Sequence, residues 1–129
     1  MALFEWETVY SVGVDRIDEQ HKRLFSIANR FQEAYERGEG RRALGAIFNE
    51  LIDYAAVHFE DEERLMRDRN YPDYPRHKEN HEKLVKLVLA YKERFEKDET
   101  GIENQVMGFI KNWLNGHILG MDRNYKPYV

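Results

Sequence analysis

The sequence predicts an all-α protein, an up-down-up-down antiparallel four-helix bundle that follows an N-terminal arm. Apolar residues recur three and four positions apart through four long segments, which is the period of one face of an α-helix. Turn residues gather in three short stretches, RGEG at 37–40, NYPDYP at 70–75 and KDETG at 97–101. Because short connections make successive helices antiparallel neighbours, four such helices are expected to close into a bundle.

The first two helices are bounded by residues that commonly cap helices. The first is expected from Asp18, a good N-cap residue, to Arg37, with Gly38 just beyond its end. The second is expected from Arg41 to Arg69. Their inward stripes are Leu24, Ala28, Phe31 and Tyr35 in the first helix and Leu44, Phe48, Leu51 and Ala55 in the second.

The third and fourth helices follow the same pattern. Pro75 suits the first turn of the third helix, which is expected to end near Asp98. The fourth helix is expected from Gly101 to His117 or slightly beyond. Their inward stripes are Leu84, Val88, Tyr91 and Phe95 in the third helix and Val106, Ile110 and Trp113 in the fourth.

A chain of 129 residues is long enough to bury one core, so a single domain over residues 1–129 is expected. Within it, residues 1–17 form the arm and residues 18–122 form the bundle. The arm contains apolar residues that must pack somewhere: Phe4, Trp6, Val9, Tyr10 and Val12.

The composition argues against several classes of protein. A net charge of -4 and a pI near 5.8 argue against a surface that binds nucleic acid. No apolar run approaches the roughly 18 residues of a membrane span, and the first ten residues do not resemble a secretory signal. We therefore expect a cytoplasmic protein with no membrane partner. The absence of cysteine excludes disulfides and thiolate metal sites, and no P-loop, Rossmann or G-x-S-x-G pattern occurs.

The five histidines extend the apolar stripes at helical spacing. His58 follows Ala55 by three positions, and Glu62 follows His58 by four. The same spacing places every histidine on an inward face. These histidines are His21, His58, His77, His81 and His117. Glu62 is therefore expected to point inward, whereas its neighbours Glu60, Asp61 and Glu63 are expected to be solvated.

Topology brings these side chains to one end of the bundle. They lie at the start of the first and third helices and at the end of the second and fourth, which are adjacent in an antiparallel arrangement. A single inward histidine is more often a hydrogen-bonded core residue, and a lone glutamate in an acidic run is usually on the surface. Together, however, so many buried polar groups would be costly without a partner, and a metal ion accepts both imidazole and carboxylate ligands. The joint pattern favours a metal site.

Asp122 could add a further ligand, although its spacing is irregular. It follows His117 by five positions, which leaves the two side chains roughly 140° apart on an ideal α-helix. They share a face only if the turn widens to a π-type turn or if the helix ends there. Gly116 and Gly120 would make either departure easy. Taken alone, Asp122 would be expected on the surface.

The order and spacing of these residues resemble the hemerythrins, most closely the single-domain bacterial forms called bacteriohemerythrins. The resemblance rests on VGVDRIDEQHKRLF, HFEDEE, HKENH and HILGMD, which occur in the order typical of the family and cover nearly the whole chain. The residue types alone would suit iron, manganese or zinc. The resemblance implies a cofactor of two iron ions, a non-haem di-iron centre bridged by a single oxo or hydroxo oxygen.

The resemblance also implies a role for each ligand. One iron would be held by His77, His81 and His117, and the other by His21 and His58. Glu62 and Asp122 would bridge both ions. The second iron then has one ligand fewer, and O2 would bind at its open position. The residues expected to surround that position are Leu24, Phe25, Phe59, Trp113, Leu114 and Ile118.

The leading hypothesis is a protein that binds O2 reversibly, for oxygen storage, transport, delivery or sensing, and that is not an enzyme. One alternative is a di-iron oxidase or peroxidase, although ferritin-like di-iron sites use Glu-x-x-His pairs that the inward positions of this chain lack. Another is an O2 or redox sensor module, which would need a separate output partner. A monomer is expected, and the sequence does not identify any enzyme that receives the O2.

Overall fold

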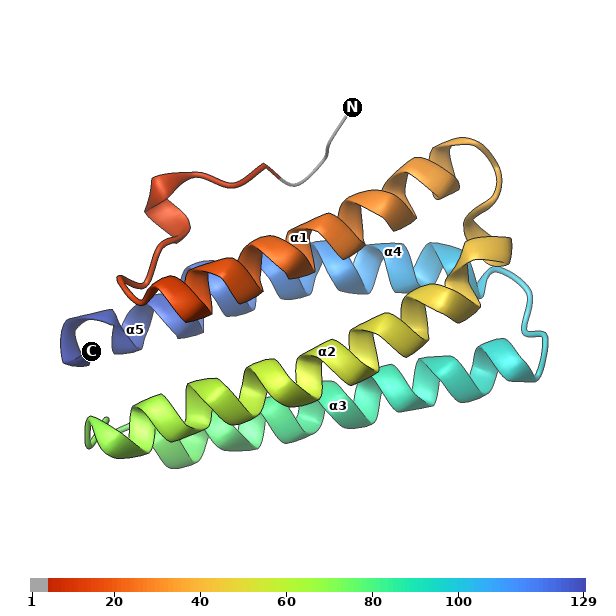
Figure 1. Cartoon of the computed structure of the whole chain (residues 1–129). Coiled ribbons are helices and arrows are strands. Elements are labelled where there is room, and N and C mark those ends of the chain that lie inside the picture. The colour runs from red at the N-terminus through yellow and green to blue at the C-terminus, as the bar shows by residue number, and fades with distance from the viewer. Residues whose placement is uncertain (1–4) are drawn as a thin grey trace.

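The computed structural model describes residues 5–129 apart from the side chain of Leu119, and it confirms the four-helix bundle. The four long helices are α1 (Asp15–Glu36), α2 (Gly40–Asp68), α3 (Tyr74–Glu96) and α4 (Ile102–Trp113). They run side by side with short connections (Figure 1). A π-helical segment, η2 (Leu114–Asp122), continues α4 directly. The remaining elements are the short helices η1 (Thr8–Tyr10), α5 (Arg123–Tyr125) and η3 (Lys126–Tyr128).

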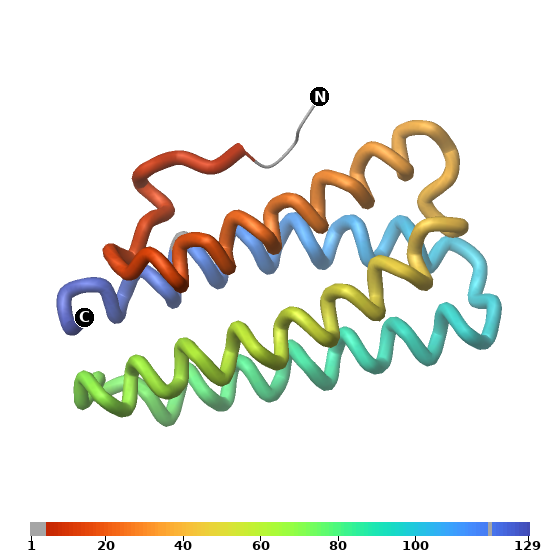
Figure 2. Tube along the Cα trace, viewed as in Figure 1, coloured from red at the N-terminus to blue at the C-terminus, as the bar shows by residue number. Residues whose placement is uncertain are grey.

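The helices run alongside one another, as the trace in Figure 2 shows, and the core lies between them along their common axis. The inward stripes expected for α1, α2 and α4 are largely buried, with Phe31, Leu44 and Ile110 each at most 1% exposed. The stripe expected for α3 is only partly buried and packs against the edge of the core, with Leu84, Val88, Tyr91 and Phe95 in this position. α3 buries His77 and His81 completely, so its contribution to the interior is concentrated at one end.

The start of α1 differs from the expectation. α1 begins at Asp15, because the residue before it, Val14, is extended and serves as the N-cap position. The Asp18 carboxylate does not cap the helix from its first position. It lies within the first turn and accepts hydrogen bonds from the backbone N–H of Val12 at 2.9 Å and from the Ser11 hydroxyl at 2.6 Å. Asp18 therefore fastens the arm to α1.

The arm packs against α1 through two aromatic side chains. The rings of Trp6 and Tyr10 lie 5.8 and 5.3 Å from the ring of Phe25. Val12 is buried in a second core cluster, which consists of Val12, Ile17, Met66, Tyr71 and Tyr125. Val9 is 46% exposed, so the expectation that every apolar residue of the arm packs against the protein is wrong for Val9. Phe4 lies outside the described residues.

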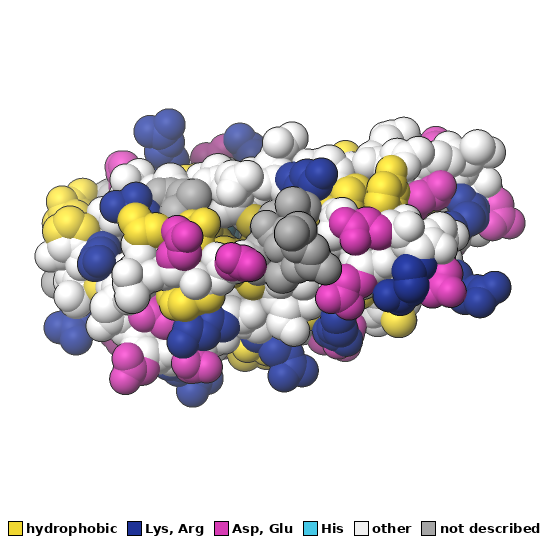
Figure 3. All heavy atoms as spheres, turned by 90° about the horizontal axis from the view of Figure 1, so that it is seen from above, with side chains coloured by type: hydrophobic (Ala, Val, Ile, Leu, Met, Phe, Trp, Pro, Cys, Tyr) yellow, Lys and Arg dark blue, Asp and Glu magenta, His cyan; other side chains and the backbone are white. Residues whose placement is uncertain are grey.

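The histidines are hidden from the surface, which carries many charged side chains and some exposed apolar ones, such as Leu87 and Leu89. On the face shown in Figure 3, acidic and basic side chains are interspersed. No histidine is visible on the part of this face that is not drawn in grey. Within residues 5–129, no helix combines the length and the apolar character that a membrane span requires.

Two glycines are expected to respond oppositely to the same substitution. Gly38 follows α1 with φ of +76°, a conformation that is strained for alanine, so Gly38→Ala should lower the free energy of unfolding by about 1 kcal/mol. Gly108 lies inside α4 with nothing within 4 Å of an added Cβ atom. Gly108→Ala should therefore raise the free energy of unfolding by about 0.5–1 kcal/mol, through helix propensity. Urea denaturation measures both, and a shift of the same sign in the two variants would contradict this account.

Candidate metal centre

Seven polar side chains meet inside one end of the bundle. This end holds the start of α1 and α3 and the end of α2 and η2, which lie together at the left of Figure 1. All seven side chains are at most 5% exposed. They are the seven predicted from the sequence: His21, His58, Glu62, His77, His81, His117 and Asp122.

The seven side chains form two overlapping groups whose potential ligand atoms lie within 4.8 Å of one another. One group contains Glu62, His77, His81, His117 and Asp122, and the other contains His21, His58, Glu62 and Asp122. Glu62 and Asp122 belong to both groups. The arrangement therefore offers two adjacent cation positions that share a pair of carboxylates.

The oxygens of each shared carboxylate are divided between the two groups. Asp122 Oδ2 lies 3.0 Å from His21 Nε2, whereas Asp122 Oδ1 lies 3.0 Å from His77 Nε2 and 3.1 Å from His117 Nε2. Glu62 Oε1 contacts His58 Nε2 and lies 3.3 Å from His21 Nε2, while Glu62 Oε2 faces His77. Each carboxylate thus presents one oxygen to each group, which is the orientation of a bridging ligand.

The π-helical segment brings Asp122 to this position. A regular α-helix would leave His117 and Asp122 roughly 140° apart. The helix does not end between them; instead its turns widen over Leu114–Asp122. Of the two alternatives that the sequence left open, the structure has the π-type turn. π-helical insertions occur frequently at functional sites because they turn a side chain that would otherwise point away.

Several buried atoms in the centre make no well-aligned hydrogen bond among the described residues, although oppositely charged or polar atoms lie close to them. These atoms are His58 Nε2, His77 Nε2, Glu62 Oε2 and both carboxylate oxygens of Asp122. Buried polar atoms are nearly always paired, and leaving them unpaired costs free energy. All of them face the interior of the two groups, and imidazole nitrogen and carboxylate oxygen are both good ligands for iron. The residues therefore fit a pair of cations.

Comparison with known proteins agrees with this geometry. A model of the hemerythrin family, described as the hemerythrin HHE cation binding domain, matches residues 12–129. The chain belongs to the hemerythrin family. The family resemblance that the sequence motifs predicted is thereby confirmed.

Relatives of this hemerythrin are similar over nearly its whole length. A bacteriohemerythrin of Stenotrophomonas maltophilia (strain R551-3) is 36% identical over 129 residues, which span all of this chain and 83% of the relative. A hemerythrin-like protein of Naegleria gruberi is 33% identical over 123 residues, which span 95% of this chain and 91% of the relative. A crystal structure of wild-type hemerythrin superimposes with a TM-score of 0.87 at 31% identity, covering 98% of each chain.

Electrostatics in the centre of this hemerythrin depend on the carboxylates. Burial alone would lower the pKa of His21, but hydrogen bonds and attraction from Asp122 and Glu62 outweigh burial and raise that pKa to about 10. At His81 burial is the larger effect and lowers the pKa to about 3. Without a metal, a proton on His21 therefore supplies the positive charge between the carboxylates. A bound cation would displace that proton.

Two members of the acidic run hold histidines in place, so the expectation that they are solvated is wrong. Asp61 and Glu63 have side chains only 13% and 16% exposed, whereas Glu60 is 70% exposed as expected. Glu63 Oε2 accepts a hydrogen bond from His81 Nδ1 at 2.9 Å. Asp61 reaches His58 indirectly, through a side chain of α1.

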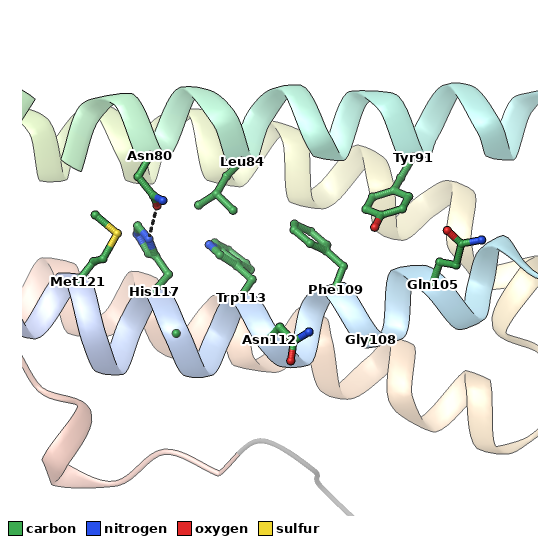
Figure 4. A pocket seen from close by; sticks show the side chains of 11 residues that line it. Asn80, Leu84, Tyr91, Gln105, Gly108, Phe109, Asn112, Trp113, His117 and Met121 are labelled. Atoms are coloured by element: carbon green, nitrogen blue, oxygen red, sulfur yellow. Dashed lines mark hydrogen bonds between the residues drawn. The ribbon is translucent and has the colours of Figure 1, made fainter. Parts of the chain in front are cut away.

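Amide side chains complete the outer hydrogen bonds, and sequence reasoning missed them. Asn80 Oδ1 accepts from His117 Nδ1 at 2.9 Å, the dashed contact in Figure 4. Gln20 Oε1 accepts from His58 Nδ1 at 2.7 Å. Each amide directly precedes another inward histidine in the sequence. The sequence signal that could have identified these two amides is a polar residue directly before an inward histidine.

The six residues expected around the O2 position are all in the buried core. The Phe59 ring stacks on the His81 ring with centroids 3.9 Å apart, and the Trp113 ring lies 6.2 Å from that of His117. Leu24, Phe25, Leu114 and Ile118 are each at most 5% exposed. Phe59 and Trp113 thus pack against histidine rings of the centre, while the role of each of the six residues in contacting O2 remains a prediction.

A groove of about 640 Å³ lies on the outer side of His117, between α3 and the helix formed by α4 and η2. Figure 4 shows Asn80 and Leu84 facing Trp113 and His117 across this groove. His117 lines this groove and, at 5%, is the most exposed of the seven side chains.

Proposed function

We propose that this hemerythrin binds O2 reversibly at a di-iron centre and acts in oxygen storage, transport, delivery or sensing. His77, His81 and His117 would hold one iron, and His21 and His58 would hold the other. The observation that supports this proposal is the division of Glu62 and Asp122 oxygens between two buried groups of histidines. When bound, two ferrous ions supply the two electrons that O2 takes up on binding and returns on release.

The protein side chains perform three tasks in this proposal. Five neutral imidazoles and two carboxylates would hold both ions, and the smaller set of histidines around one of them would leave room there for O2. The apolar residues around that place exclude water. Exclusion of water also removes proton donors, which would otherwise promote irreversible oxidation of the iron.

Metal analysis and O2 exposure test the proposal. The oxidised protein should contain two iron ions per chain and absorb visible light through oxygen-to-iron charge transfer. The reduced protein should form a coloured adduct with O2 that bleaches under vacuum and forms again when O2 is readmitted. A single zinc ion per chain would contradict the di-iron assignment.

The same mixing experiment separates O2 carriage from enzymatic oxidation. We propose carriage because the centre is rich in histidine and has an apolar surround. An oxidase or peroxidase would convert the adduct rapidly and release a product. Multiple turnovers that consume a reductant would therefore overturn this part of the proposal.

We also propose that the protein is a single domain over residues 1–129, that it is a monomer and that it is cytoplasmic. Sedimentation velocity tests the monomeric state.

Leu114→Ala is expected to accelerate autoxidation of the O2-bound protein about tenfold, equivalent to a barrier lowered by about 1.4 kcal/mol. Leu114 is 2% exposed, and its truncation would leave space for water beside the proposed O2 position. The decay of the adduct absorption in air measures the rate. Leu44→Ala is the matched control, because Leu44 is buried in the same core near the start of α2, far along that helix from His58. Equal rates in the two variants would remove Leu114 from the proposed pocket.

A further inference from the structure

A chain of hydrogen bonds links the surface of the bundle to His58. Arg16 Nε donates to Asp61 Oδ2 at 2.8 Å, and Gln20 Nε2 donates to the same oxygen at 2.6 Å. Gln20 Oε1 in turn accepts from His58 Nδ1 at 2.7 Å. Arg16 and Gln20 belong to α1, while His58 and Asp61 belong to α2. The chain therefore crosses the contact between two helices before it reaches the centre.

The chemistry of the chain fixes its direction. An ionised carboxylate only accepts hydrogen bonds, so the Gln20 amide must turn its NH2 group toward Asp61. Its carbonyl oxygen then faces His58, and an oxygen at that position requires a proton on His58 Nδ1. The neutral ring carries only one ring proton, so His58 Nε2 is then left with a lone pair that can bind a cation shared with Glu62.

Asp61 is well suited to hold this orientation. Its Oδ2 atom accepts hydrogen bonds from both Gln20 and Arg16, and the Arg16 guanidinium lies 2.8 Å away. These contacts favour the ionised carboxylate, which has no proton to donate and acts only as an acceptor. Gln20 is only 7% exposed, so water has little access to compete for its amide.

Two other histidines of the centre are oriented differently. His81 donates directly to the Glu63 carboxylate, and His117 donates to the Asn80 amide. His58 reaches the Asp61 carboxylate only through the Gln20 amide. The amide still fixes the orientation of the His58 ring, but it keeps the negative charge of Asp61 farther from that ring.

We propose that Asp61 is a positioning residue for the metal centre, which acts through Gln20 to hold His58 in the tautomer whose Nε2 can bind a cation. This inference rests on the proposed function only insofar as His58 is a metal ligand.

The test compares Asp61→Asn with Glu60→Gln in the full chain, using Zn²⁺ as the probe. The amide introduced by Asp61→Asn could donate or accept, so Gln20 would be free to turn its NH2 group toward His58 and favour the unsuitable tautomer. Asp61→Asn should weaken Zn²⁺ binding about tenfold, at the lower end of the loss typical of an outer hydrogen-bond partner. Competition with a chromophoric chelator measures the affinity. Glu60→Gln removes one charge from the same acidic run at an exposed position and should leave the affinity unchanged.

A double variant, Gln20→Glu with Asp61→Asn, distinguishes orientation from charge or packing. It exchanges the carboxylate and the amide while keeping the net charge, so the carboxylate now on α1 accepts hydrogen bonds from both His58 and the amide now on α2. The double variant should recover the affinity lost in Asp61→Asn, whereas a merely structural role for Asp61 predicts a further loss. Nitrogen-15 chemical shifts of His58 in the metal-free chain, with helicity checked by circular dichroism, should show Nδ1 protonated in the wild type and the double variant.

Equal Zn²⁺ affinity in Asp61→Asn and Glu60→Gln would overturn the proposal, as would a double variant weaker than Asp61→Asn. Neither result depends on O2. A wild type that binds Zn²⁺ with the expected dependence on Asp61 but fails to bind O2 reversibly would leave this inference standing and refute the proposed function.

Discussion

Replacing Glu62 with glutamine is expected to reduce the iron content from two ions per chain to at most one and to abolish O2 binding. Glu62 lies in both groups of ligands and is completely buried. Glutamine has nearly the same shape, but its neutral amide offers one oxygen where the carboxylate offers two. The loss of metal affinity should exceed the roughly 10–100-fold loss seen when an outer partner of a metal ligand is removed.

Glu60→Gln is the matched control for Glu62→Gln, since it makes the same chemical change two residues earlier on α2. Glu60 is 70% exposed and should be replaceable without loss of iron. Iron content by atomic absorption and the O2-dependent visible spectrum provide the two measurements. Retention of two iron ions and a reversible adduct in Glu62→Gln would show that Glu62 does not bridge the ions.

Removal of the metal is expected to lower the midpoint of thermal unfolding by about 10–15 °C. Metal bound at about a thousand times its dissociation constant stabilises a folded protein by about 4 kcal/mol, and each kcal/mol shifts the midpoint of a domain of this size by about 3–4 °C. The physical origin is the set of buried atoms that lack well-aligned hydrogen bonds, including both oxygens of Asp122. In the metal-free chain only protons carried by the neighbouring histidines can compensate for their burial.

Circular dichroism during heating, with and without a strong chelator, measures this shift. Addition of excess Fe²⁺ without air should restore the midpoint, which controls for any effect of the chelator itself. An unchanged midpoint after iron has been removed would mean that the seven polar side chains satisfy one another without a cation.

The bundle and six of its seven converging side chains could be predicted from helical periodicity, whereas Asp122 was predicted only through the resemblance to hemerythrins. Positions such as Leu24, His58 and Ile110 repeat at three and four residues, and this spacing determines which side of a helix faces inward. The sequence could not choose between a widened turn and a helix end before Asp122, because both place that residue near the centre. That choice depends on how η2 packs.

Residues outside the inward stripes were harder to predict. Asp61 and Glu63 lie on the flanks of α2, where the rotation of neighbouring helices decides whether a side chain meets water or a partner. Gln20 contacts Asp61 across the interface between α1 and α2, so its place beside His21 in the sequence could mark it as a candidate but could not reveal its partner. The partial burial of the α3 stripe has a similar cause, because it depends on the separation of α3 from α4.

The widened turn also sets the rotational phase of everything that follows it. Without the widening, a regular α-helix over the same residues would rotate the chain beyond it by about 100°. Asp122 would then point away from the centre, and Tyr125, which is completely buried in the second core cluster, would turn out of its place with it. The widened turn thus places both a ligand and a core side chain that lie three residues apart.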